Sequence, residues 1–270
     1  MSDQKLIEPI ILMCSERSGS NLITRMFDAH PEVAAPGTSH IMYVFSENAW
    51  KYGANHSALK RDLLDMFRAK ISSWLIDAMP LDQLEAIIED TDTAAGAITR
   101  LLQAELSATG KSIFFMKENS VHRFLPFLER IATRPRYVFM VRDPRNMALS
   151  WQKAAVMRGG IIRSAKRWVD DQTGYLRAVS WLENEHPVAR LSYEDLIAEP
   201  EQALRRVCEN IGLPFSNDML EFNTRSRSAL ADAERAAVWS NLAQPVIANS
   251  AAKFASELSE DQLAYIEHLC

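Results

Sequence analysis

Residues Pro9–Leu22 read PIILMCSERSGSNL, and this stretch decides which fold the chain can adopt. Its first half is an apolar run of strand length, and after a polar turn a helical pattern of apolar side chains begins at Leu22. A strand, a tight turn and a helix N-terminus in this order form an anion site. The first-turn N–H groups lack partners within the helix, and the helix dipole adds positive potential. We therefore expect a phosphate-like group to bind at this turn.

The polar turn itself supplies groups that suit an anion. Gly19 lets the backbone approach an oxyanion closely. Ser18, Ser20 and Asn21 add side-chain donors, and the guanidinium of Arg17 adds a fixed charge with a planar set of N–H groups. The turn is not a Walker A loop, GxxxxGK[ST], because the Gly-Lys pair is missing and Arg17 precedes the glycine. The alternative is an ordinary strand–turn–helix connection with polar residues.

A second informative segment, Arg136–Trp151, reads RYVFMVRDPRNMALSW. Tyr137–Val141 is a continuous apolar run, typical of a parallel strand buried on both faces, and the Asp-Pro pair after Arg142 is a helix-start signal. Ser150 follows Arg142 by eight residues, about two turns into that helix. Because such helices run back past the strand ends, Arg142 and Ser150 could hold one phosphate from two sides. In the alternative, Arg142 caps the strand and Ser150 is a surface hydroxyl.

Together these segments resemble the sulfotransferase family, whose members use 3′-phosphoadenosine 5′-phosphosulfate (PAPS) as donor. RSGSN resembles the family's loop for the 5′-phosphosulfate, and VRDPRNMALS resembles its 3′-phosphate motif. Two more matches occur in the expected order. The KEN at residues 117–119 resembles the region after the third strand, and the LSYEDL at residues 191–196 resembles a segment that places a tyrosine near the nucleotide. The resemblance covers roughly residues 8–215.

The resemblance implies a nucleotide site made by Arg17, Ser18, Gly19, Ser20, Asn21, Leu22, Arg142, Ser150 and Tyr193. It also implies that Arg17 neutralises charge on the donor and that Lys117 touches the transferred sulfonate; a plain strand-end lysine is the alternative at position 117. The implied donor is PAPS and the implied product is adenosine 3′,5′-bisphosphate (PAP). No metal is implied.

The general base is harder to assign. Relatives that share the RSG loop often carry a glutamate just beyond the second strand, but here Gly37 and Thr38 occupy that place, and neither accepts a proton usefully. His40 lies two residues on, and an imidazole with a pKa near neutrality suits the role. A helix-start histidine facing solvent or the core is the alternative. Glu118 and His122 are the other candidates.

Alternating strand and helix patterns predict an α/β fold. We expect a three-layer sandwich with a central, mostly parallel sheet of about five strands, P-loop NTPase-like, in one domain over residues 1–270. The expected strands are Ile10–Cys14, Glu32–Ala35, Ser112–Met116, Tyr137–Val141 and Val188–Leu191, and the first helix is Ser20–Ala29. Ligands bind at the carboxyl ends of such strands, so Arg17, Lys117, Arg142 and Tyr193 should share one edge.

A helical insertion of about residues 39–110 is expected to form part of the acceptor site. Its apolar positions from Leu63 to Leu75 recur at helical spacing and predict one buried face. Its aromatic residues could line an acceptor pocket or pack in the core: Tyr43, Phe45, Trp50 and Trp74.

The composition of the chain excludes several classes of protein. The chain has 270 residues and a net charge of −5, which gives no case for binding nucleic acid or an anionic membrane. Three cysteines, far apart, are too few for a disulfide framework or a zinc cluster. No signal peptide or apolar run of membrane-spanning length is visible. Because many animal Golgi members of the family that the chain resembles carry a membrane anchor, the resemblance then implies a cytoplasmic, bacterial enzyme.

The sequence thus predicts a PAPS-dependent sulfotransferase that moves a sulfuryl group in line to a hydroxyl or amine. The acceptor could be a small molecule such as a phenol, a carbohydrate, a lipid or a peptide, and the oligomeric state is open. Two alternatives belong to other classes. A P-loop-type nucleotide phosphotransferase would need a Walker lysine and a magnesium-binding acid, and both are missing. A non-catalytic nucleotide-binding protein would keep the anion site and lack a base.

Overall fold

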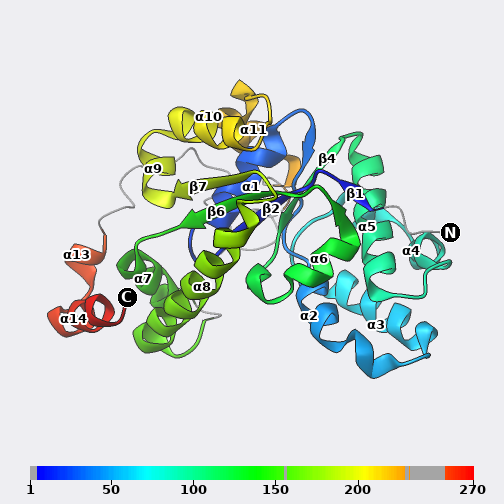
Figure 1. Ribbon diagram of the computed structural model, residues 1–270, viewed down its shortest axis with the longest axis horizontal. Helices are drawn as coiled ribbons and strands as arrows, with labels where there is room; N and C mark the ends of the chain where they lie inside the picture. Colours follow the sequence, from blue (N-terminus) through cyan, green and yellow to red (C-terminus); the bar gives the residue numbers. More distant parts are fainter. Residues whose placement is uncertain (1–4, 155–156, 229–230, 232–252) are drawn as a thin grey trace.

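The computed structural model describes residues 5–154, 157–228, 231 and 253–270. Within these residues a five-stranded, fully parallel sheet forms the centre, in the order β3-β4-β2-β6-β7 (Figure 1). The strands are β2 (Ile10–Cys14), β3 (Val33–Ala34), β4 (Ile113–Lys117), β6 (Arg136–Val141) and β7 (Val188–Ser192). The predicted α/β class and the parallel five-stranded sheet are confirmed.

Helices cover both faces of this sheet and make three layers (Figure 1). The helices on one face are α1 (Ser20–Ala29), α9 (Tyr193–Ala198), α10 (Pro200–Asn210) and α11 (Phe222–Arg225). The other face carries α5 (Ala94–Thr109), α6 (Leu125–Ile131) and α8 (Gly160–Leu182). No helix in the described part of the chain is long and apolar enough to cross a membrane.

Strand β2 shows why the sheet is central. All five of its side chains are buried, with Ile10, Leu12 and Cys14 packing on the α1 face and Ile11 and Met13 on the opposite face. An apolar strand without a polar face must lie inside a parallel sheet with helices on both sides. Helix α1 has the predicted bounds, because Pro31 disfavours helical geometry at the preceding residue.

The insertion contains α2 (Ile41–Asn48), α3 (His56–Ala69), α4 (Leu81–Ile88) and α5. The predicted buried face is wrong beyond α3: Ile71 follows the end of that helix and is 63% exposed. Trp74 is buried again in the core, where its indole N–H donates to the Gly37 carbonyl over 2.9 Å. Phe45 therefore packs in the core with Trp74, whereas Trp50 is 76% exposed.

A small second sheet, made of two short strands, and helix α9 were not predicted. Strands β1 (Leu6–Ile7) and β5 (Ala132–Thr133) pair as a separate two-stranded parallel sheet, too short to carry a periodic signal. Helix α9 begins directly after β7, where the Ser192 hydroxyl accepts from the N–H of Asp195 over 3.0 Å. A serine followed by an acid three residues later is a helix-start signal that could have predicted α9.

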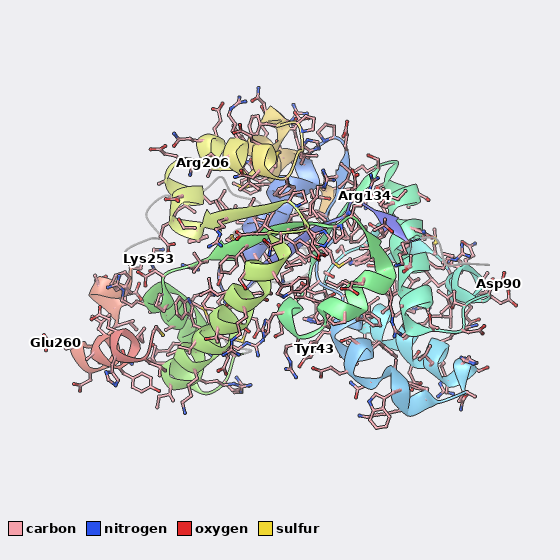
Figure 2. All side chains as sticks on the ribbon, viewed as in Figure 1. Tyr43, Asp90, Arg134, Arg206, Lys253 and Glu260 are labelled. Atoms are coloured by element: carbon pink, nitrogen blue, oxygen red, sulfur yellow. The ribbon has the colours of Figure 1, made fainter. Side chains whose placement is uncertain are left out.

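The C-terminal helices α13 (Phe254–Glu257) and α14 (Glu260–Leu269) pack on α8 and on α7 (Pro144–Lys153). Helix α14 begins with a capping box, in which the Ser259 hydroxyl accepts from the N–H of Gln262 and the Gln262 side chain accepts from the N–H of Ser259. Figure 2 shows Lys253 and Glu260 on this side of the molecule, across from Asp90 in the insertion. Lys253 is exposed.

Candidate active site

The turn after β2 combines two left-handed residues with an uncapped helix. Arg17 has φ 63° and Gly19 has φ 88°, and no side chain caps the N-terminus of α1. The N–H of Leu22 already donates to the Gly19 carbonyl over 2.9 Å. In the described part of the chain no partner is found for the N–H groups of Ser20 and Asn21. These two N–H groups, rather than that of Leu22, are therefore the ones available to an anion.

Two of the predicted side-chain donors face the protein. The Ser18 hydroxyl points toward Met147 Sδ of α7, 4.0 Å away, and the Ser20 hydroxyl bonds Cys14. Burial raises the pKa of the Cys14 thiol to about 12, so that neighbour stays neutral. The Ser18 N–H also donates to the Ser15 carbonyl over 3.4 Å, so of these two serines only Ser20 keeps a backbone N–H without a partner among the described residues.

Tyr193, the first residue of α9, lies directly against Gly19. A Cβ at Gly19 would come within 2.2 Å of Tyr193 Cδ2, so only glycine leaves room for the ring. The guanidinium carbon of Arg142 lies 4.2 Å from the centre of the same ring. The aromatic face thus joins the end of β7 to the two anion-binding segments.

Arg17, Arg142 and Ser150 form one cluster. Arg142 Nη1 donates to the Arg17 carbonyl over 2.9 Å, and Arg17 Nε donates to Ser150 Oγ over 3.2 Å. Arg142 Nε is buried, and among the described residues no acceptor reaches it. Burial lowers the pKa of both arginines, first of all through desolvation. A buried donor without a partner and two desolvated cations leave this cluster short of negative charge.

The helix that carries Ser150 is positioned as predicted. Asp143 caps α7, and its carboxylate accepts from the N–H of Arg145 over 2.8 Å. The Arg142 carbonyl accepts from the indole N–H of Trp168 on α8 over 2.9 Å. Both bonds hold the backbone at the end of β6, from which the Arg142 side chain extends.

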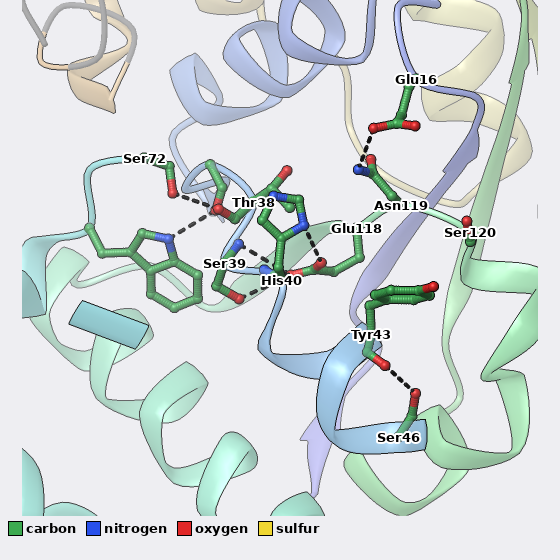
Figure 3. Close-up of polar contacts among 12 residues, drawn as sticks. Glu16, Thr38, Ser39, His40, Tyr43, Ser46, Ser72, Glu118, Asn119 and Ser120 are labelled. Carbon is green, nitrogen blue, oxygen red and sulfur yellow. Dashed lines mark hydrogen bonds and ion pairs between the residues drawn. The ribbon is translucent and has the colours of Figure 1, made fainter. Parts of the chain in front are cut away.

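A second polar cluster follows β4. Glu118 comes directly after Lys117, the last residue of β4, and its side chain is 1% exposed. Its Oε1 accepts three hydrogen bonds, from the Ser39 N–H (3.2 Å), the Ser39 hydroxyl (3.0 Å) and the His40 N–H (3.0 Å) (Figure 3). This carboxylate therefore fastens the loop that carries His40. Burial raises the pKa of Glu118 to about 7.

His40 stands at the N-terminus of α2 in the left-handed conformation, with φ 63°. Its ring is 49% exposed, and Nδ1 lies 3.9 Å from Glu118 Oε2 (Figure 3). Desolvation and then the charge of Lys117 lower the pKa of His40, and desolvation lowers the pKa of Lys117. A neutral imidazole with an exposed edge can accept a proton at neutral pH.

The other candidate histidine, His122, lies in a more enclosed place than His40. The His122 ring packs edge-on against Tyr175 of α8, 4.7 Å between centres, and a Cβ at Gly174 would touch it at 2.3 Å. Burial, followed by the charge of Arg167, lowers the pKa of His122 to about 4. A base with so low a pKa is a poor proton acceptor at neutral pH.

Sequence reasoning missed a network that links the β2 turn to the loop after β4. Asn119 Nδ2 donates to Glu16 Oε1 over 3.2 Å (Figure 3). Arg167 of α8 lies 3.8 Å from Glu16 Oε2 and donates from Nε to Asp171 Oδ2 over 3.0 Å. The spacing of Arg167 and Asp171 predicts a pair on one helix face, but not that the pair meets Glu16.

A cavity of about 250 Å³ lies elsewhere, beside β3. Asp28, Glu105 and Lys111 are among its lining residues, and none of the predicted site residues is. The Asp28 carboxylate is already bonded to Ala35 N–H and to the hydroxyls of Ser226 and Ser228. In the described residues no group of three potential metal ligands occurs.

The raised pKa of Glu118 predicts a pH dependence of stability. Because the folded-state pKa of about 7 exceeds the ordinary value of 4.5, this group's contribution is complete below pH 4.5 and is lost as the pH rises to 7. Relative to Glu118→Gln, wild-type protein should lose up to about 3 kcal/mol of unfolding free energy over that interval. Urea denaturation of both proteins at a series of pH values measures this, and parallel stability curves would contradict it.

Known proteins resemble this chain in both sequence and fold. The sequence profile described as the sulfotransferase family matches residues 9–217. The sulfotransferase domain of the Synechococcus PCC 7002 olefin synthase has a TM-score of 0.64 at 19% identity, covering 98% of this chain and 96% of that chain. The sulfotransferase domain of the curacin biosynthetic pathway has a TM-score of 0.63 at 18% identity, covering 98% of both. At these identities the two structures show a shared fold.

A curated relative gives a sequence match. Chicken (Gallus gallus) protein-tyrosine sulfotransferase 2 is 24% identical over 212 residues, or 76% of this chain and 51% of the chicken protein. The chain spans 51% and 65% of the length of the two curated relatives that it matches first. The profile match runs from β2 through the β6–α7 segment to the region beyond α10, and it includes every predicted nucleotide-binding residue. The chain therefore belongs to the sulfotransferase family.

Proposed function

We propose that this protein transfers a sulfuryl group from PAPS to a hydroxyl or amine of an acceptor and releases PAP. One observation carries the proposal. The two anion-binding segments, far apart in the sequence, meet in the Arg17–Ser150–Arg142 cluster. The buried, partnerless Nε of Arg142 and the uncapped N-terminus of α1 are both donors without acceptors, as a nucleotide with two separate phosphates requires.

In this proposal the residues divide between two phosphates. The N–H groups of Ser20 and Asn21 bind at the 5′ side, where the Gly19 turn brings the backbone close. Arg142 and Ser150 hold the 3′-phosphate, with the partnerless Nε as one donor. Tyr193 fixes the direction of Arg142 through its ring.

PAPS supplies a sulfuryl group on a phosphate leaving group. Arg17 neutralises the charge that develops as the S–O bond breaks, and Lys117 stabilises the sulfonate oxygens. By analogy with phosphoryl transfer, positioning and electrostatics carry most of the rate. His40 takes the proton from the acceptor.

The helical insertion supplies the acceptor side in this proposal, because His40 and Tyr43 both belong to α2 or its N-terminus. The Tyr43 hydroxyl accepts from Arg123 over 3.1 Å and lies one turn along the helix from His40. A histidine ring and a tyrosine hydroxyl on one helix can hydrogen-bond a polar acceptor, such as a carbohydrate or another small hydroxyl compound. The single domain, the cytoplasmic location and the bacterial source stay predictions from the sequence.

The decisive experiment compares the binding of PAP, ADP and ATP by calorimetry without magnesium. PAP should bind selectively, because only PAP carries the 3′-phosphate that Arg142 and Ser150 are proposed to hold. At 100 times its dissociation constant it should stabilise the fold by about 2.7 kcal/mol in a thermal shift. Preference for ATP would favour a phosphotransferase instead, and no binding would overturn the nucleotide site.

Arg142→Ala should weaken PAP binding by about 1.5–3 kcal/mol, because a charged hydrogen bond to the 3′-phosphate is lost. Affinity for ADP, which lacks that phosphate, should change much less. Arg145→Ala is the matched control, since Arg145 lies three residues after Arg142 but its guanidinium is paired with Asp143 (2.7 Å) and with Glu267 of α14 (2.9 Å). Equal losses for PAP and ADP in the Arg142 variant would contradict the assignment.

A further inference from the structure

The two oxygens of the Glu118 carboxylate have opposite surroundings. Oε1 accepts all three bonds from Ser39 and His40, whereas Oε2 is buried and, among the described residues, receives no hydrogen bond. A buried carboxylate oxygen without a donor costs free energy, so it calls for a partner. His40 Nδ1 lies 3.9 Å from this oxygen.

The same carboxylate bonds the backbone of His40 and faces its ring. The His40 N–H is bonded to Oε1, and the ring of that residue faces Oε2 (Figure 3). The left-handed backbone at His40 is uncommon for a residue with a side chain, and such strain gathers at functional sites. A hydrogen bond needs the 3.9 Å gap to close by about 1 Å, and such bonds often tighten only when substrate binds.

We propose that Glu118 is a positioning residue for His40. Its Oε2 accepts the Nδ1–H of the neutral imidazole and so leaves the lone pair on Nε2, at the half-exposed edge, to take the proton of the acceptor. This inference rests on the proposed transfer reaction and adds the residue that makes its base competent.

The proton and electron pairs balance in this scheme. The acceptor O–H or N–H bond breaks as the acceptor's lone pair forms the new bond to sulfur, and the proton moves to His40 Nε2. The bond from sulfur to the 5′-phosphate oxygen breaks, and PAP leaves with that electron pair. Oε2 then faces an imidazolium, whose positive charge the carboxylate stabilises. The proton leaves to solvent from the exposed edge of the ring.

The charges around the pair support this role. The positive charge of Lys117 acts to lower the pKa of both His40 and Glu118. The pKa of Lys117 depends in turn on the Cys14 thiol, Glu118, Arg25 and Glu16. Lys117 alone would disfavour a second positive charge on His40. A carboxylate at Oε2 offsets that repulsion when His40 accepts the proton.

The test is the tautomer of His40, read by nitrogen-15 NMR of protein labelled at its six histidines. The spectrum of His40→Ala identifies the signal. At about pH 9, where both groups have lost their protons, the wild-type ring should carry its proton on Nδ1. A wild-type ring protonated on Nε2 overturns the proposal.

Glu118→Gln sharpens this test without removing the loop contact. The amide oxygen can still accept from Ser39 and the His40 N–H, but the NH₂ group in place of Oε2 donates to Nδ1. The proton should therefore move to Nε2, which abolishes the base. An unchanged tautomer in a folded Gln variant overturns the proposal, and the wild-type spectrum decides alone if that variant does not fold.

Kinetics separates positioning from a structural role. With PAPS and with water as the acceptor, Glu118→Gln should lower kcat at least about 100-fold, as wrong-tautomer variants do. The same substitution in a His40→Ala background should change kcat no further, and additive losses would overturn the proposal. Ser39→Ala, which removes one donor to Oε1, should lower kcat less than about tenfold. The expected tautomers without any PAP formation would refute sulfuryl transfer and leave the pair intact.

Discussion

Arg17→Ala should lower the rate of sulfuryl transfer by about 10³-fold or more, the largest effect that we expect of one side chain. Groups that neutralise developing charge are worth about 10²–10³ in kcat, and a transition-state arginine in phosphoryl transfer about 10³–10⁵. Arg17 is held ready for this role, since its Nε is bonded to Ser150 and its carbonyl to Arg142. Single-turnover formation of PAP from PAPS measures the effect.

Binding supplies the control for Arg17. A group that acts mainly in the transition state changes kcat more than the affinity for product. PAP affinity of the Arg17→Ala variant should therefore fall far less than its rate. Arg17→Lys keeps the charge without the fork of donors and should recover part of the rate. A rate loss below tenfold for alanine would remove Arg17 from the reacting centre.

Gly19→Ala should destabilise the fold by about 3 kcal/mol and abolish PAP binding, because two costs combine at this position. The left-handed backbone, φ 88°, costs a residue with a Cβ about 1–2 kcal/mol. The new Cβ would also collide with the Tyr193 ring at 2.2 Å, and overpacking costs about 1–3 kcal/mol. Urea unfolding and calorimetry with PAP measure the two effects.

Gly110→Ala is the matched control for this substitution. Gly110 ends α5 with φ 67°, and a Cβ there would meet nothing within 4 Å, so only the backbone cost of about 1–2 kcal/mol should appear. Adding Tyr193→Ala to the Gly19 variant should relieve the collision and restore part of the stability. Equal losses at the two glycines would show that the ring does not pack on Gly19.

The sequence predicted the local parts of the site well. Strand β2 and helix α1 have the expected bounds, because an unbroken apolar run, a glycine turn and a following proline act within a few residues of one another. The Asp143 cap of α7 is equally local. Placing both anion-binding segments at one edge followed from the parallel sheet alone, since strand ends meet there.

The parts that sequence could not predict depend on contacts between distant residues. Glu118 lies 78 positions after His40, and no pattern says that its carboxylate fastens that loop. The packing of Tyr193 on Gly19 and the bond from Arg17 to Ser150 are likewise tertiary. The pairing of β1 with β5 spans two residues on each strand, too few for any periodicity to appear.

The strand order has a consequence for how the molecule is made. β2 is the first strand of the large sheet to leave the ribosome, yet its neighbours β4 and β6 are synthesised about a hundred residues later. Such non-local pairing makes folding slow, because long loops must close first. Tyr193 reaches Gly19 only after most of the chain exists. A ligand that binds where Tyr193 meets Gly19 therefore binds only the completely folded protein, and its binding energy stabilises that state against partly folded ones.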